Sequence, residues 1–292
     1  MTLCLALKAL DWDFGSSPLP EAIVLCSDSL GSNDFSSTEN VSKFETLPQG
    51  FGAMLAGQVA TARELLQVVR EKIEDGPIHR ITDLLDRLRQ SVRQQKQRFA
   101  EEHIGARLGI SYREFRQNGR SAFSDDLFRE TSWEIRNHRL EAELLIAGFI
   151  KGRATIVKLS AEQVTVCDSY GAIGSGALLA EASLMQRDYL PMGGVDYAAY
   201  IAFEAKRMSE RAPGVGRQTG LMALRSRPSG DTILDIYPPD FMSILDADFK
   251  RFAPRPLAAR KLTPIRGHWF RVIGSDHELT TDDSIPQPPS QE

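Results

Sequence analysis

Short apolar runs alternate along the chain with longer stretches in which apolar residues recur at helical spacing. The short runs are typical of buried strands, because they are mostly apolar and bounded by glycine, proline or polar turns. We expect strands at residues 2–10, 22–27, 51–56, 142–149, 154–159, 163–168, 221–225 and 232–236. The helical spacing predicts helices at residues 59–74, 81–108, 177–189 and 195–211.

The strands and helices occur in groups, with pairs of helices between groups of strands. This grouping favours an α+β fold in which helices cover sheets, and it disfavours alternating βαβ units. Residues 109–140 are polar with isolated aromatics, a pattern that leaves open a helical insertion or a mobile flap. From Pro238 the pattern is irregular, and residues 280–292, with three prolines and no sizeable apolar cluster, are predicted to be disordered. We expect one domain at residues 2–237 and an extension at residues 238–292.

Composition excludes several classes of partner. The chain has 292 residues, 42% of them hydrophobic and 25% charged, with a net charge of −4. This acidic balance disfavours nucleic acid, and no apolar run approaches the ~20 residues that a membrane span requires. Cys4, Cys26 and Cys167 lie in apolar stretches without CxxC spacing, which predicts reduced cysteines in a cytoplasmic protein. The histidines lack metal-binding spacing, so we expect no metal and no cofactor.

A threonine at position 2 is the first candidate for chemistry. Methionine aminopeptidase removes an initiator Met that precedes a small residue, which would leave Thr2 with a hydroxyl nucleophile and a free α-amine. An α-amine has a pKa of about 7.7–8.0 and is a suitable base near neutral pH. Lys43 beside it would favour the neutral amine by charge repulsion, and Asp28, at the end of a predicted strand, would orient Lys43.

The order of these residues resembles the β-subunits of the proteasome and the related peptidase of the heat-shock locus V protease. Both are N-terminal-nucleophile (Ntn) threonine hydrolases. The matching positions are Thr2, Ser27-Asp28, Lys43, Leu55-Ala56-Gly57 and Gly174-Ser175-Gly176, and the apolar strand at residues 143–148 also looks like a family strand. The similarity covers roughly residues 2–108 and 140–237.

The resemblance implies a four-layer αββα sandwich and a role for each matched residue. Thr2 would be nucleophile and base, Lys43 the modulator of its amine, Asp28 the partner of Lys43, the Gly57 backbone N–H the oxyanion donor, and Ser175 a partner of the amine. Gly31, Val41, Leu55 and Val59 would line the substrate pocket. Taken alone, Gly57 is also typical of a strand end, and Gly174-Ser175-Gly176 of a helix N-cap with Ser175 capping.

The resemblance also implies partners. The substrate would be an unfolded protein or a peptide, and the chain would assemble into a homo-oligomeric ring. A separate ATPase unfoldase is a further candidate partner, because the chain has no phosphate-binding Gly-x-x-x-x-Gly-Lys-Ser/Thr motif of its own.

The chain departs from the family pattern in two places. Active members carry a closely spaced Asp and Ser after the fourth helix, whereas residues 207–220 here contain no Asp and form a longer segment. Ser209 or Glu210 is a candidate replacement for the Asp, and Gln218 or Thr219 for the Ser. The first hairpin is also longer than the pattern, within residues 11–21. Two alternatives to a peptidase remain open: a catalytically silent scaffold or interaction subunit, and an Ntn amidohydrolase acting on a small amide.

The apolar side chains expected in the substrate pocket predict a preference among peptides. Peptides with a hydrophobic residue before the cleaved bond should be hydrolysed faster than peptides with an acidic or basic residue there. A matched series of fluorogenic peptides that differ only at this residue measures the preference. Equal turnover of all three classes would contradict the predicted pocket.

Overall fold

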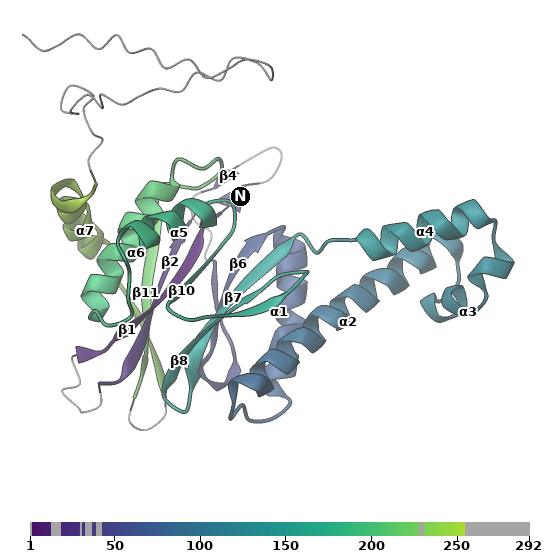
Figure 1. The fold of residues 1–292 in the computed structure, drawn as a ribbon, viewed down its shortest axis with the longest axis horizontal. Helices are drawn as coiled ribbons and strands as arrows, with labels where there is room; N and C mark the ends of the chain where they lie inside the picture. Colours follow the sequence, from purple (N-terminus) through teal and green to yellow (C-terminus); the bar gives the residue numbers. More distant parts are fainter. Residues whose placement is uncertain are drawn as a thin grey trace, which may run out of the picture. The chain divides into compact units, whose positions relative to one another are not determined.

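The computed structural model describes residues 2–12, 19–29, 31–32, 37–38, 43–227 and 231–254, which form a mixed α+β fold with two antiparallel sheets (Figure 1). This confirms the predicted α+β class. The strands are β1 (Cys4–Leu10), β2 (Glu21–Asp28), β3 (Gly31–Ser32), β4 (Ser37–Thr38), β5 (Phe44–Thr46), β6 (Gly52–Gly57), β7 (Ala142–Ile150), β8 (Arg153–Leu159), β9 (Val164–Cys167), β10 (Tyr170–Ile173), β11 (Thr219–Ser226) and β12 (Thr232–Ile236). The helices are α1 (Val59–Glu74), α2 (Ile81–Leu108), α3 (Tyr112–Ala122), α4 (Asp125–Asn137), α5 (Ala177–Gln186), α6 (Val195–Ser209) and α7 (Pro239–Phe252).

The first sheet brings together three strand ends that carry the candidate chemistry. Its strand order is β10-β1-β2-β11-β12, and each neighbouring pair is antiparallel. Cys4 lies opposite Ser27 in the β1–β2 pair, and Thr219 lies opposite Asp28 in the β2–β11 pair. The start of β1, the end of β2 and the start of β11 therefore meet at one edge of the sheet.

The second sheet has the order β5-β6-β7-β8-β9, and a cluster of buried side chains lies between it and the first sheet. Successive side chains of a strand point to opposite faces. Cys4 and Ala6 of β1 belong to the cluster between the sheets, whereas Leu5 and Leu7 belong to the cluster under α5 and α6. Both faces of β1 are thus buried, which explains its almost uninterrupted apolar sequence.

Helices cover the outer face of each sheet (Figure 1). Helices α5, α6 and α7 contribute side chains to the buried cluster of the first sheet. Helices α1 and α2 contribute to the cluster of the second sheet, through residues such as Leu65, Val69 and Leu88. The helical spacing read from the sequence therefore marks the faces that pack on the sheets.

The sequence left open a helical insertion or a mobile flap at residues 109–140. The structure has helices there, α3 and α4. Both pack on the C-terminal half of α2, away from the sheets (Figure 1). Phe115 is buried there, and its ring centroid lies 5.1 Å from that of Phe128. Phe115, Phe123 and Phe128 thus pack together in a small helical module, whereas Trp133 is exposed.

The prediction of irregular structure from Pro238 is wrong for residues 239–252, which form α7. Leu245 of α7 is 2% exposed and belongs to the cluster under the first sheet, with Phe241 and Phe249 packed against it. The compact unit accordingly runs to Ala253 instead of ending at residue 237. The predicted disorder of residues 280–292 lies outside the described residues.

The packing of α7 predicts a large difference between two adjacent side chains. Leu245→Ala should lower the free energy of unfolding by about 2–4 kcal/mol, because it leaves a cavity in the core. Ile244→Ala is the matched control, since Ile244 is 57% exposed and its truncation should change stability by about 0.5 kcal/mol or less. Urea denaturation of the full chain measures both. Equal stability of the two variants would show that α7 does not belong to the folded core.

Candidate active site

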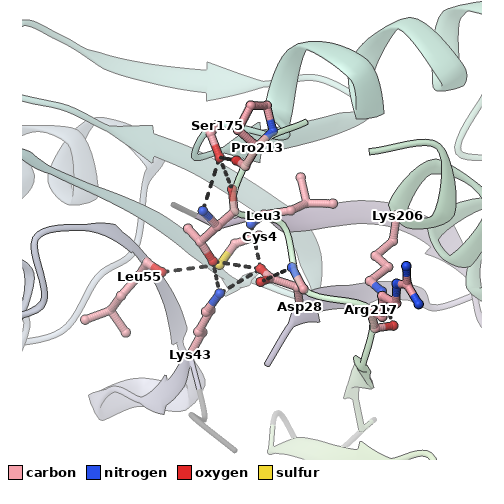
Figure 2. Close-up of polar contacts among 11 residues, drawn as sticks. Leu3, Cys4, Asp28, Lys43, Leu55, Ser175, Lys206, Pro213 and Arg217 are labelled. Atoms are coloured by element: carbon pink, nitrogen blue, oxygen red, sulfur yellow. Dashed lines mark hydrogen bonds and ion pairs between the residues drawn. The ribbon is translucent and has the colours of Figure 1, made fainter. Parts of the chain in front are cut away.

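The structure brings together Thr2, Asp28, Lys43 and Ser175, which come from separate parts of the sequence (Figure 2). Thr2 precedes β1 and Asp28 ends β2, so the antiparallel register of these strands places them side by side. Lys43 immediately precedes β5 of the second sheet. Ser175 lies in the turn between β10 and α5. The predicted grouping of these four residues thus agrees with the geometry.

The Thr2 hydroxyl lies between an anion and a cation. Thr2 Oγ1 donates a hydrogen bond to Asp28 Oδ1 at 2.8 Å and accepts one from Lys43 Nζ. Lys43 Nζ also forms an ion pair with Asp28 Oδ1 at 2.7 Å. All three side chains are buried, with 5%, 0% and 7% of their area exposed for Thr2, Asp28 and Lys43. Low solvent access strengthens these electrostatic interactions.

The Asp28 carboxylate receives four described donors from three segments of the chain. Oδ1 accepts from the Leu3 N–H at 2.7 Å in addition to Thr2 and Lys43, and Oδ2 accepts from the Gly216 N–H at 3.0 Å. Burial alone would raise the pKa of Asp28, but the hydrogen bonds from Leu3, Lys43 and Gly216 outweigh it and hold the pKa below its usual value. Asp28 is therefore a fixed anion that keeps Lys43 in place.

Ser175 contacts the backbone of Thr2. The Thr2 backbone N–H donates to Ser175 Oγ at 3.3 Å, and Ser175 Oγ lies 3.4 Å from the Thr2 carbonyl and 3.2 Å from the Pro213 carbonyl. A hydroxyl has one proton, so these two carbonyls compete for it. The N-cap of α5 is Gly176 and no side chain caps it, so Ser175 is not the capping residue.

Gly174 allows this close approach between the turn and Thr2. Its φ is +90°, and a Cβ added there would lie 2.3 Å from the Thr2 carbonyl oxygen. The Gly176 N–H then donates to that same oxygen at 3.2 Å. The turn therefore requires glycine at position 174 both for its backbone conformation and for space.

The four side chains considered as replacements after the fourth helix do not hydrogen-bond to Thr2 in the described part of the chain. Ser209 Oγ lies within hydrogen-bond distance of the Gly176 and Ala205 carbonyls, and Glu210 pairs with Lys206 and Arg207. Thr219 begins β11 opposite Asp28, and the Gln218 carbonyl accepts from the Ser29 N–H.

Backbone groups of residues 210–218, the α6–β11 loop, reach the site instead (Figure 2). The Pro213 carbonyl lies within hydrogen-bond distance of Ser175 Oγ, and the Gly216 N–H donates to Asp28. Sequence reasoning missed both residues because it searched for side chains. The only signal was the run of small and turn-forming residues from Ala212 to Gly216.

Gly57 ends β6 with φ +96°, and an added Cβ would lie 2.3 Å from the Glu141 carbonyl oxygen. This backbone conformation suits the end of a strand, and no described hydrogen bond links Gly57 with Thr2.

Leu55 points its side chain toward the cluster under α1, and Val59 is 52% exposed. Of the other expected pocket residues, Gly31 begins β3 and Val41 lies outside the described residues.

Within the described part of the chain, no group of three or more His, Cys, Asp or Glu is placed to hold a metal ion. No helix formed by these residues is long and apolar enough to cross a membrane.

Cys4 and Cys26 are buried free thiols, as predicted, and burial raises the pKa of each to about 12. Neither is a thiolate near neutral pH, which leaves Thr2 as the nucleophile candidate of this site.

Comparison with known protein families finds no family that matches this chain. Comparison with curated proteins finds no match either. What the site does is therefore argued from its geometry and chemistry.

Removing the charge of Asp28 tests the electrostatics of the site. Asp28→Asn should lower the free energy of unfolding near pH 7 by about 3–5 kcal/mol, because it leaves the buried Lys43 without its anion. The lowered pKa of Asp28 contributes stability that is present above the unfolded-state pKa of about 4 and is lost as the pH falls through the folded-state value. The variant lacks this titration, so its stability should fall less than that of the wild type below about pH 4.

Denaturation at a series of pH values measures this difference. Asp86→Asn is the matched control, because Asp86 on α2 is 67% exposed and pairs only with Arg89 among the described ion pairs. Parallel pH profiles for Asp28→Asn and the wild type would contradict the description of Asp28 as a buried anion.

Proposed function

We propose that the chain is a threonine peptidase of the Ntn-hydrolase type, with Thr2 as nucleophile after removal of Met1. One observation carries this proposal: the Thr2 hydroxyl, the Asp28 carboxylate and the Lys43 ammonium form one buried cluster. A hydroxyl held between a lysine and an aspartate, on the same residue as an α-amine, has the parts of a self-contained nucleophile and base.

The same proposal extends to the fold. Two antiparallel sheets with a buried cluster between them, and helices on the outer face of each, are what the αββα sandwich of the Ntn hydrolases requires. In this interpretation, α3 and α4 are an insertion into that sandwich, and α7 is an additional helix that packs on the first sheet.

The proposed reaction is acyl transfer. Thr2 Oγ1 attacks the substrate carbonyl, and the Thr2 α-amine accepts its proton. Lys43, fixed by Asp28, favours the neutral amine and stabilises the negative charge that develops on the oxygen. Ser175 orients the amine through its contact with the Thr2 nitrogen. The Gly57 N–H is the proposed donor to the oxyanion. The amine returns its proton to the leaving group, and water then hydrolyses the ester on Thr2.

The α6–β11 loop supports this function despite its departure from the family pattern. A backbone carbonyl accepts a hydrogen bond as a carboxylate does, and the Pro213 carbonyl lies 3.2 Å from Ser175 Oγ, while the Gly216 N–H donates to Asp28. The lack of an Asp in this loop is therefore compatible with an ordered site. The expected ring, the unfolded-protein substrate and the ATPase partner belong to this proposal as well.

Peptidase assays on substituted full-length chains test the proposal. Thr2→Ala should abolish hydrolysis of an apolar fluorogenic peptide. Lys43→Met should lower kcat/KM about 10³-fold, because no ammonium then favours the neutral form of the Thr2 α-amine. Lys8→Met is the matched control, since Lys8 is a half-buried lysine of β1 outside the candidate site, and it should retain the wild-type rate.

Two results would contradict the proposal. One is full activity of Thr2→Ala, which would remove Thr2 from the reaction. The other is a wild-type chain with a free Thr2 that hydrolyses neither peptides nor small amides, which would favour a silent scaffold. Hydrolysis of small amides alone would favour an Ntn amidohydrolase.

A further inference from the structure

Lys206, near the C-terminal end of α6, is completely buried. An isolated ammonium group is very costly to bury, so a buried lysine needs partners for its charge and its donors. Lys206 Nζ has two in the structure: Glu210 Oε1 at 2.6 Å and the Arg217 backbone carbonyl. None of the reaction steps described above uses this residue.

The two partners of Lys206 lie near the two ends of the α6–β11 loop. Glu210 is the first residue of this loop, and Arg217 is the last but one. Between them lie the two backbone groups that reach the candidate site, the Pro213 carbonyl beside Ser175 and the Gly216 N–H bound to Asp28. The Arg217 carbonyl belongs to the 217–218 peptide unit, and the Gly216 N–H belongs to the 215–216 unit, with one peptide unit between them. A clamp on this carbonyl therefore restricts the chain close to the Gly216 donor. Figure 2 shows Lys206 reaching toward Arg217.

We propose that Lys206 is a positioning residue of the candidate active site, whose ammonium fixes both ends of the α6–β11 loop and thereby holds the Gly216 N–H on Asp28. Lys206 acts here through backbone and does not touch the reacting atoms. The link to catalysis rests on the proposed function, whereas the effect on the loop does not.

The last turn of α6 reinforces this arrangement. Ser209 is buried, and its Oγ lies 3.1 Å from the Gly176 carbonyl of the turn that carries Ser175, where it competes with the Ala205 carbonyl at 2.8 Å for the hydroxyl proton. One helix end thus contacts both segments that support Thr2 and Asp28. A helix is a stiff element, and a site supported by such an element keeps a defined geometry.

The same helix offers a matched control in Glu204. This carboxylate is 1% exposed and binds Arg187 through two hydrogen bonds of 2.6 and 2.7 Å, with the Tyr200 hydroxyl as a third donor. Arg187 and Tyr200 precede Glu204 in the sequence, whereas the α6–β11 loop follows it. No described hydrogen bond links either residue with this loop. Loss of Glu204 therefore removes a buried ion pair from α6 without removing the proposed clamp.

The experiment compares Lys206→Met and Glu204→Gln in the full chain, by amide hydrogen exchange and by the rate of modification of Thr2 with an epoxyketone threonine-protease probe. We expect Lys206→Met to speed exchange in residues 210–218 and to slow modification by about 10- to 100-fold, as for loss of a hydrogen bond to a charged group. Without the Gly216 donor, Asp28 holds Lys43 less firmly, and Lys43 then favours the neutral Thr2 amine less. The acid limb of the pH–rate profile, which reports this amine, should therefore move to higher pH.

Glu204→Gln should change neither exchange in the loop nor the pH–rate profile. Glu210→Gln serves as a second variant if Lys206→Met does not fold. It removes the anion at one end of the clamp, which also pairs with Arg207, and leaves the Arg217 contact, so it should give an intermediate rise in exchange at residues 210–218. Unchanged exchange in that loop in either Lys206→Met or Glu210→Gln, or an equal rise in Glu204→Gln, would overturn the proposal. Failure of the wild type to react with the probe would instead overturn the proposed function, and the exchange data would still decide the role of Lys206.

Discussion

The arrangement of the site depends on the hydrogen bonds that the buried carboxylate of Asp28 accepts. A charge without solvent contact is stable only if donors surround it. The four described donors of Asp28 come from the two residues before β1, from Lys43 and from the α6–β11 loop. Each of these segments must therefore reach the end of β2. The need to solvate one anion from within the protein thus determines where the nucleophile candidate, its lysine and a loop from the opposite end of the sequence lie.

The sheets make this convergence possible. Antiparallel pairing of β1 and β2 places the residues before β1 beside the end of β2, and pairing of β2 with β11 places the end of the α6–β11 loop there as well. Lys43 reaches the same point from the second sheet, across the buried cluster that joins the sheets. A slip of the β1–β2 register by one residue would separate Thr2 from Asp28.

Much of this arrangement could be predicted from the sequence, and the exceptions have physical causes. Strong apolar periodicity marked the long strands and the helices that pack on sheets, and residues with distinctive side chains, such as Thr2 and Lys43, could be grouped by their order. Helix α7 was missed because its few buried side chains, such as Leu245, lie among polar residues. Gly216 and Pro213 were missed because they act through backbone atoms, which every residue has, and the run of small and turn-forming residues that contains them does not by itself indicate a site.

Intact-protein mass spectrometry of the purified chain, before and after treatment with an epoxyketone, tests the central claim most directly. The probe closes a ring with both the hydroxyl and the free amine of an N-terminal threonine, so it reports nucleophile and base together. The account predicts loss of Met1 and a single adduct on Thr2. A chain that retains Met1, or a free Thr2 that does not react, would contradict it.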